Sequence, residues 1–344
     1  MAYTTINKST DYFNTKLYTG TGSSLALTGV GFQPDLTWIK NRTAGSGADH
    51  IWTDSVRGVT KSLNSNDNSA DDTISNALTA FGTDGFTVGG NGATGASGDT
   101  YAAWNWKAGT TSGLTTNGTT TITPTSYSFN STAGFSILKY TGNGAAGAYV
   151  AHGLGTTPAM IIVKKLSGSA GWFVYHQKLQ STYNIYLNTN DAEFGGAYVY
   201  SPDATNFRLR DHNDVNQNGE TYVAYCFVEK TGYSKFGKYI GNGNANGTFV
   251  YTGFKPAFIM VKRYDGTGLS WRFFDSKRNY NGDREFMYAN LTDLEVGGDN
   301  MDFLSNGFKN RNTSGHQNGN SDDYIYMAFG QSLVGTNNIP ATAR

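Results

Sequence analysis

The sequence predicts an all-β protein built from three tandem β-sandwich (jelly-roll) domains, and three observations predict it. Glycine contributes 44 of the 344 residues, and aromatic residues make up 14% of the chain. Charged residues make up only 15%. Many short strands joined by tight turns have this composition, whereas disordered chains lack the aromatic surface that offsets chain entropy. The third observation is a set of motifs that occurs three times in the same order, which indicates an internal repeat.

The repeat is anchored by Gly-x-x-Pro, followed by an apolar run that ends in lysine. The anchor lysines are Lys40, Lys164 and Lys262. A Tyr-x-Gly-x-Gly motif precedes each anchor, and a tryptophan follows it. These tryptophans are Trp52, Trp172 and Trp271. Each repeat closes with Tyr-x-Ala-aromatic, at Tyr101–Trp104, Tyr222–Tyr225 and Tyr326–Phe329. Four motifs in one order, three times over, predict a triplicated unit.

Domain boundaries follow from the spacing of the anchors. The first interval is longer than the second, and the extra length coincides with a Thr, Ser and Gly-rich stretch that we interpret as a partly extended connector. A unit of this length can bury a core of its own, so we expect a string of domains. The predicted segments are repeat one (1–108), the connector (109–132), repeat two (133–231), repeat three (232–335) and a C-terminal tail (336–344).

Within a repeat the pattern favours strands. The runs Met160–Val163 and Phe258–Val261 are apolar at successive positions, as in a strand covered on both faces or a central strand of a sandwich. Asp84-Gly85 and Asn306-Gly307 predict tight turns, because these pairs accept positive φ. Further strands are expected at 135–140, 172–175, 183–187 and 222–228. We expect about six to eight strands per repeat, with one or two helical turns at Asp72–Phe81.

Motifs that would carry catalysis or bind metal are weak. No Gly-x-Ser-x-Gly elbow occurs, the lone Cys226 lies in a predicted strand, and none of the five glutamates recurs at an anchored position. Asn66–Asn68 with Asp71–Asp72, and Asp211–Asp214, offer oxygens of the kind that Ca²⁺ accepts, but asparagine-rich and aspartate-rich turns look the same. We therefore expect no enzyme activity, metal or cofactor.

Carbohydrate is the best-supported small ligand from the residues alone. Exposed tryptophan rings can stack on sugar rings, and asparagine and aspartate side chains can bond the hydroxyls. Five tryptophans are candidates on this basis: Trp52, Trp172, Trp271, Trp104 and Trp106. A tryptophan that recurs at one place in a repeat is also what a core position produces, and of the two interpretations we favour the core.

Charge and targeting patterns narrow the partners. The 26 basic residues balance the 26 acidic ones, so we expect no nucleic-acid binding by phosphate neutralisation. No apolar window is long enough to insert into a membrane. Met1–Lys8 lacks the apolar segment of a signal peptide. We therefore expect synthesis and folding in a cytoplasm, with release by lysis.

Several segments spread over the whole chain resemble a family of structural proteins of marine tailed phages. They are Met1–Ile6, Tyr12–Gly20, Gln33–Arg42, Asp54–Lys61, Tyr101–Gly109 and Gly335–Arg344. The resemblance implies concanavalin-like, lectin-type β-sandwich modules and a place in the virion, often in tail or fibre proteins. It supplies no catalytic residues to transfer.

Three functional hypotheses follow. The first is a non-enzymatic tail fibre or adhesin on the virion exterior that attaches to glycan on the host surface. The second is a capsid decoration or cement protein. The third, a glycan depolymerase, requires two neighbouring carboxylates. We expect contacts with other virion proteins and a homo-oligomer, with a trimer as the first choice. Repeat one is the candidate for docking to the particle.

Overall fold

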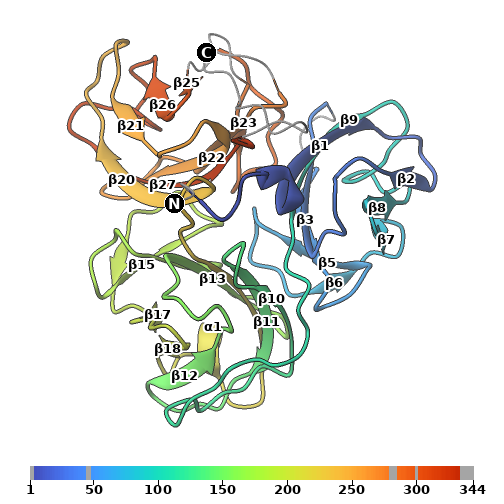
Figure 1. Ribbon diagram of the computed structural model, residues 1–344, viewed down its shortest axis with the longest axis vertical. Helices are drawn as coiled ribbons and strands as arrows, with labels where there is room; N and C mark the ends of the chain where they lie inside the picture. The colour runs from blue at the N-terminus through green and yellow to red at the C-terminus, as the bar shows by residue number, and fades with distance from the viewer. Residues whose placement is uncertain (1–3, 44–47, 279–284, 299–300, 334–344) are drawn as a thin grey trace.

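Figure 1 shows the computed structural model of the protein, which describes residues 4–43, 48–278, 285–298 and 301–333. Strands contain 42% of the residues and helices only 2%, so nearly all of the regular secondary structure is β. The strands form several antiparallel sheets packed as sandwiches, which confirms the all-β fold class. The two short helices in the described residues are η1 (Ser9–Asp11) and α1 (Asn213–Asn216).

Three large sheets form the centre of the molecule. The first, in spatial order, is β1 (Phe13–Thr19), β9 (Thr100–Trp106), β3 (Leu36–Asn41), β4 (Ile51–Asp54), β5 (Lys61–Asn64) and β6 (Asp72–Thr73). The second is β10 (Ser126–Asn130), β11 (Phe135–Thr141), β19 (Thr221–Phe227), β13 (Met160–Lys165), β14 (Phe173–His176), β15 (Tyr183–Tyr186) and β16 (Phe194–Gly195). The third is β20 (Ser234–Ile240), β27 (Asp323–Gly330), β22 (Pro256–Arg263), β23 (Arg272–Asp275) and β24 (Met287–Tyr288).

Each large sheet is paired with a three-stranded sheet on its outer side. The first small sheet is β2 (Leu25–Leu27), β8 (Gly85–Val88) and β7 (Leu78–Gly82). The second is β12 (Ala148–Ala151), β18 (Asn206–Leu209) and β17 (Val199–Tyr200). The third is β21 (Phe249–Tyr251), β26 (Gly307–Asn310) and β25 (Met301–Leu304).

The chain path through these sheets is the same three times. In each repeat the first and last strands pair, the strand after the Gly-x-x-Pro anchor lies on the other side of the last strand, and the next two strands follow in order. The small sheet of each repeat is built from the second strand of the repeat and from the two strands that come just before its last strand. The triplicated sequence pattern therefore corresponds to a triplicated topology, while the exact residue limits of the repeats stay a prediction.

A pair of stacked tyrosines explains why the Tyr-x-Gly-x-Gly motif recurs. Its tyrosine stacks on the first tyrosine of the closing strand with ring centroids about 5 Å apart in every repeat. The pairs are Tyr18–Tyr101, Tyr140–Tyr222 and Tyr239–Tyr324. The third closing motif therefore begins at Tyr324, and the alignment at Tyr326 was shifted by two residues. A two-residue shift keeps the side-chain alternation of a strand, so the sequence pattern does not reveal it.

The glycines of this motif permit two loops to pack backbone against backbone. A Cβ on Gly20, Gly142 or Gly241 would lie 2.2–2.3 Å from a carbonyl oxygen of the loop before the closing strand. Close approach also explains the predicted turns, because a Cβ on Gly307 would lie 2.1 Å from the oxygen of Val250. Glycine at this turn is thus required by the neighbouring strand rather than by positive φ.

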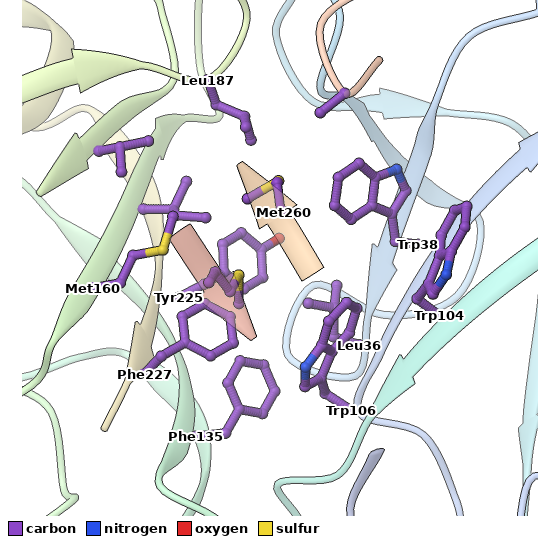
Figure 2. Packing of buried hydrophobic residues seen from close by; sticks show 14 of the residues in the cluster. Leu36, Trp38, Trp104, Trp106, Phe135, Met160, Leu187, Tyr225, Phe227 and Met260 are labelled. Carbon is purple, nitrogen blue, oxygen red and sulfur yellow. The ribbon is translucent and has the colours of Figure 1, made fainter. Parts of the chain in front are cut away.

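The apolar runs are buried on both faces, as their sequence predicts. Ile161 and Val163 point into the core between the large and small sheets of repeat two, whereas Met160 and Ile162 point to the opposite face. That opposite face meets the corresponding faces of the other two large sheets. Figure 2 shows the meeting point, with side chains from all three repeats around one centre.

This shared central cluster corrects the expectation of a string of domains. Rings from different repeats are in direct contact: Trp52 and Trp172 have centroids 5.2 Å apart, and Trp38 and Phe273 have centroids 5.0 Å apart. The largest group of buried apolar residues belongs to no single repeat. Each repeat does bury its own smaller core between its two sheets, so it has one private core and one third of a common core.

Two local predictions differ from the structure. The Asp72–Phe81 segment forms strands β6 and β7 rather than helical turns, because neighbouring strands supply partners for its backbone. The connector at 109–132 is not a free linker: β10 extends the large sheet of repeat two, and Ile122 forms a bridge with Val150. The predicted tail at 336–344 lies outside the described residues.

The common core should make unfolding of the three repeats cooperative. Trp104 is buried against Phe273 of repeat three, so Trp104→Ala should destabilise all three repeats together by about 3–5 kcal/mol. Differential scanning calorimetry should show a single transition that moves to lower temperature. Three separate transitions, only one of them shifted, would contradict a common core. Phe207→Ala, which removes a ring from the private core of repeat two instead of the common core, is the variant against which the transition of Trp104→Ala is compared.

Candidate functional site

The five candidate tryptophans are all buried in the central cluster. Their exposed fractions are 2% or less, at Trp52, Trp104, Trp106, Trp172 and Trp271. No ring face of these residues is open to a sugar, so the stacking role proposed for them is wrong and the core interpretation holds. The central faces of the sheets, where these side chains point, are covered by the other repeats.

The strand register also corrects the equivalence of the recurring tryptophans. Val163 pairs with Phe173, Val261 with Arg272 and Ile39 with Ile51. The residues that come just before these partners therefore occupy equivalent positions in the three repeats. They are Trp172, Trp271 and His50. Trp52 lies two residues further along its strand and belongs to the same face, which again hid the shift from the sequence pattern.

Indole N–H groups join one repeat to the next, two of them at the equivalent positions Trp172 and Trp271 and the third on the closing strand of repeat one, at Trp104. Trp172 Nε1 donates to the carbonyl oxygen of Asn64 at 2.9 Å, and Trp271 Nε1 donates to that of Tyr186 at 2.8 Å. Trp104 Nε1 donates to Asp275 Oδ2 at 3.0 Å. Repeat two thus bonds to repeat one, repeat three to repeat two, and repeat one to repeat three, which closes a ring.

The anchor lysines lie at the same joints. Lys164 Nζ donates to the carbonyl oxygen of Asn68 in repeat one at 3.1 Å, and Lys40 Nζ donates to that of Thr292 in repeat three at 3.0 Å. Lys262 Nζ donates to the carbonyl oxygen of Arg263 in its own repeat at 2.7 Å, and Asp191 of repeat two raises the pKa of Lys262 against the effect of burial. All three lysines are fully buried. A buried ammonium is costly unless carbonyl oxygens accept its hydrogen bonds, and the neighbouring repeat supplies such an oxygen for Lys40 and for Lys164.

Burial controls the ionisation of these lysines. Desolvation lowers the pKa of Lys40 and of Lys164 from 10.5 to about 8, with partial compensation from nearby aspartates. The same effect lowers the pKa of Lys262 to about 7. Their ammonium groups therefore lose protons more easily in the folded chain than in the unfolded chain.

Two buried ion pairs occupy equivalent places near the centre. Arg57 Nε lies 2.6 Å from Asp54 Oδ2, and Arg278 Nε lies 2.5 Å from Asp275 Oδ2, with all four side chains 1% exposed or less. Each aspartate also accepts a bond from a neighbouring repeat, and the donor to Asp54 is Tyr225 at 2.8 Å. These carboxylates are fully bonded within the joints, so we assign them a structural role.

A pair of carboxylates, which a depolymerase would need, lies between repeats one and three. Glu285 and Glu295 are bridged by Arg42, whose Nη2 lies 3.3 Å from one and 2.6 Å from the other. Arg278 Nη1 lies 2.8 Å from Glu295 Oε1. Burial and hydrogen bonding to Glu295 raise the pKa of Glu285. Arg42 holds both carboxylates in ion pairs and Arg278 holds Glu295, so neither group is a free acid or base of the kind that a glycosidase uses.

A surface cavity of about 310 Å³ lies where the connector meets repeat two. Phe129 supplies an aromatic wall, and Thr115, Ser131 and Thr205 contribute hydroxyl-bearing residues. Gly153 and Gly155 both have positive φ, and a Cβ on Gly153 would lie 2.7 Å from Leu114 Cδ1 of the connector. The lining combines an apolar ring with hydroxyl groups, which suits an uncharged polyhydroxylated ligand. No sequence signal marked this cavity, because its walls come from four separate segments.

The remaining sequence candidates have local structural roles. His212 caps α1 by accepting a bond from the Asp214 N–H, which accounts for the Asp211–Asp214 cluster. Cys226 is buried, and desolvation raises the pKa of its thiol. Among the described residues, no group of three or more His, Cys, Asp and Glu side chains is arranged to hold a metal ion. None of the described helices has the length and apolar character needed to cross a bilayer.

Comparison with known proteins identifies the family. The family described as Domain of unknown function (DUF7483) matches residues 8–332. The chain belongs to this family. The match spans all three repeats, so the family unit is the whole ring rather than one sandwich. No curated protein and no solved structure matches the chain.

The buried lysines predict an unusual dependence of stability on pH. Unfolded lysines keep their protons up to a pKa of 10.5, whereas Lys40 and Lys164 lose them near pH 8 in the folded chain. Between these values the unfolded state binds more protons, so stability should rise with pH, by about 2 kcal/mol per lysine between pH 7.5 and 9.5. Above pH 10 the trend should reverse, because burial raises the pKa of Tyr140 and Tyr225 well above 10.

Urea unfolding followed at several pH values measures this effect. Lys164→Met should flatten the rise, whereas substitution of the exposed Lys238 by Met should leave it unchanged. A free energy of unfolding that falls steadily from pH 7.5 to 9.5 would show that the buried lysines remain fully protonated.

Proposed function

We propose that the protein is a non-enzymatic structural component on the exterior of a tailed-phage particle, a tail fibre or adhesin that binds glycan on the host surface. The observation that carries the proposal is the ring of three sandwiches closed by a common core and by hydrogen bonds at every joint. Such a ring is a rigid scaffold that presents three sets of outer loops from one chain.

Attachment benefits from this arrangement. Several weak sites on one rigid body give a higher overall affinity than any single site, provided that the geometry permits simultaneous contact. The resemblance of the sequence to marine tailed-phage structural proteins supports the same role. Assembly with other virion proteins, and into a homo-oligomer, belongs to the proposal, as does repeat one as the docking module.

The cavity beside Phe129 is the glycan subsite that we favour in place of the buried tryptophans. Its volume of about 310 Å³ admits one or two sugar rings, and its lining offers a ring face together with hydroxyl groups. The site is confined to repeat two, because only that repeat has the connector as one wall.

A cavity-filling variant tests the subsite. Ala204 lies at the cavity and is exposed, so Ala204→Trp should block the site without disturbing the core. On a glycan array, and then by titration with the glycan identified, the variant should lose at least about tenfold in affinity. Ala26→Trp, at an exposed alanine of repeat one, is the control and should bind as the unmodified chain does. If no glycan on the array binds the unmodified chain, the proposed adhesin function is wrong.

Capsid decoration is the alternative, and the position on the particle separates the two. Averaged electron micrographs of intact particles, labelled with an antibody against this chain, should place it on the tail or fibres. Label distributed over the head would overturn the fibre proposal in favour of a decoration protein.

The depolymerase hypothesis remains a third candidate because Glu285 and Glu295 lie together. We expect no sugar release from host polysaccharide, since Arg42 and Arg278 hold these carboxylates in ion pairs. Reducing-end assays with the unmodified chain and with Glu295→Gln provide the test. Sugar released by the first and not by the second would overturn the non-enzymatic assignment.

A further inference from the structure

The edge strands of the three small sheets can be compared residue by residue. These edge strands are β2, β12 and β21, and in each of them one residue that points into the core pairs with a phenylalanine of the neighbouring strand in the sheet. The pairs are Leu27 with Phe86, Val150 with Phe207 and Val250 with Phe308. The residue before each is therefore equivalent, namely Ala26, Tyr149 and Phe249. The residue after each is also equivalent, namely Thr28, Ala151 and Tyr251.

In repeat two this edge is occupied by an extended segment of the connector. The N–H groups of Thr121 and Ile122 donate to the carbonyl oxygen of Tyr149 at 3.0 and 2.9 Å, and the Ala151 N–H donates to Ile122 at 3.4 Å. The pairing with β12 is parallel, and the Ile122 side chain is buried in the private core of repeat two. Main-chain bonds and one buried apolar side chain thus hold the segment in place.

In repeat three the equivalent groups face outward. Asn310 N–H donates to Thr248 and Thr252 N–H donates to Asn306, which fixes the antiparallel register of β21 and β26. The N–H and C=O groups of Phe249 and Tyr251 therefore point away from β26. Within the described part of the chain, β21 is the outermost strand of its sheet, with nothing paired on that side.

The side chains on this edge are also unusual. Phe249 is 43% exposed and Tyr251 is 61% exposed, where repeat one carries Ala26 and Thr28. Open edge strands in natural proteins are usually covered, or protected by charge, because they pair readily with other strands. An open edge flanked by two exposed aromatic rings is therefore suited to binding a strand.

We propose that β21 is a docking edge for an extended strand of a partner protein, bound parallel to β21 as Thr121 and Ile122 bind to β12. The strand that fits is uncharged, with a branched apolar residue at the place of Ile122 and polar residues beside it. Its backbone bonds the outward groups of Phe249 and Tyr251, and the two rings cover it. The inference concerns a polypeptide partner and does not depend on glycan binding.

The connector itself supplies the probe. A labelled synthetic peptide with the sequence of residues 117–125 is titrated onto the full-length chain and followed by fluorescence anisotropy. Amide exchange is read by NMR. Binding should slow exchange of the Tyr251 amide by at least about tenfold, while the Ala151 amide, already bonded, should be slow throughout. A peptide with aspartate in place of Ile122 should bind at least about tenfold more weakly.

A variant in which β21 carries the residues that repeat one has at the equivalent positions tests the edge. Phe249→Ala with Tyr251→Thr should weaken peptide binding at least about tenfold. Thr28→Ala, at the equivalent edge of repeat one, should not change it. Binding that ignores both changes, or no binding at millimolar peptide, would overturn the proposal.

Two other occupants give distinct results, and both overturn the assignment to a partner protein. If the chain's own end covers β21, the Tyr251 amide exchanges slowly in the free protein and becomes fast when residues 334–344 are deleted. If a second copy covers it, light scattering shows a dimer that the Phe249→Ala change dissociates.

Discussion

The structure depends on burial of the central faces of three β-sheets against one another. Each large sheet carries apolar side chains on both faces, and its small sheet covers only one of them. The second face would remain a large apolar surface in an isolated repeat, which soluble domains rarely expose. The other two repeats cover it, and aromatic rings such as Trp38, Trp104 and Phe273 fill the junction. Three private cores and one common core are therefore needed together.

Burying the sheet faces also buries polar groups, and these groups give the ring its specificity. Indole N–H groups, lysine ammonium groups and carboxylates at the joints each bond to a neighbouring repeat. An apolar junction alone would tolerate rotation of one sheet against the next, whereas a buried donor without its acceptor costs free energy. The joints are similar without being identical, since His50 replaces a tryptophan at one of them.

The function we propose lies on the outside of this ring, where the repeats differ most. Only repeat two has the connector, which creates the cavity beside Phe129 and covers the edge of β12. Only repeat three presents two exposed aromatic rings on the equivalent edge. A conserved interior with diverged edges is what we expect when one building block is reused for separate contacts.

The sequence by itself determined the all-β class, the triplicated unit and the two-sided burial of runs such as Met160–Val163, because composition, motif order and side-chain alternation are local properties. It did not determine the site. The recurrence of Trp52 and Trp172 favoured a core position but left a surface site open, since alternation shows that two side chains share a face but not what covers it. The common core, the pairing of Glu285 with Glu295 and the strand formed by the connector were decided only by tertiary structure, because each depends on contacts between residues far apart in the chain.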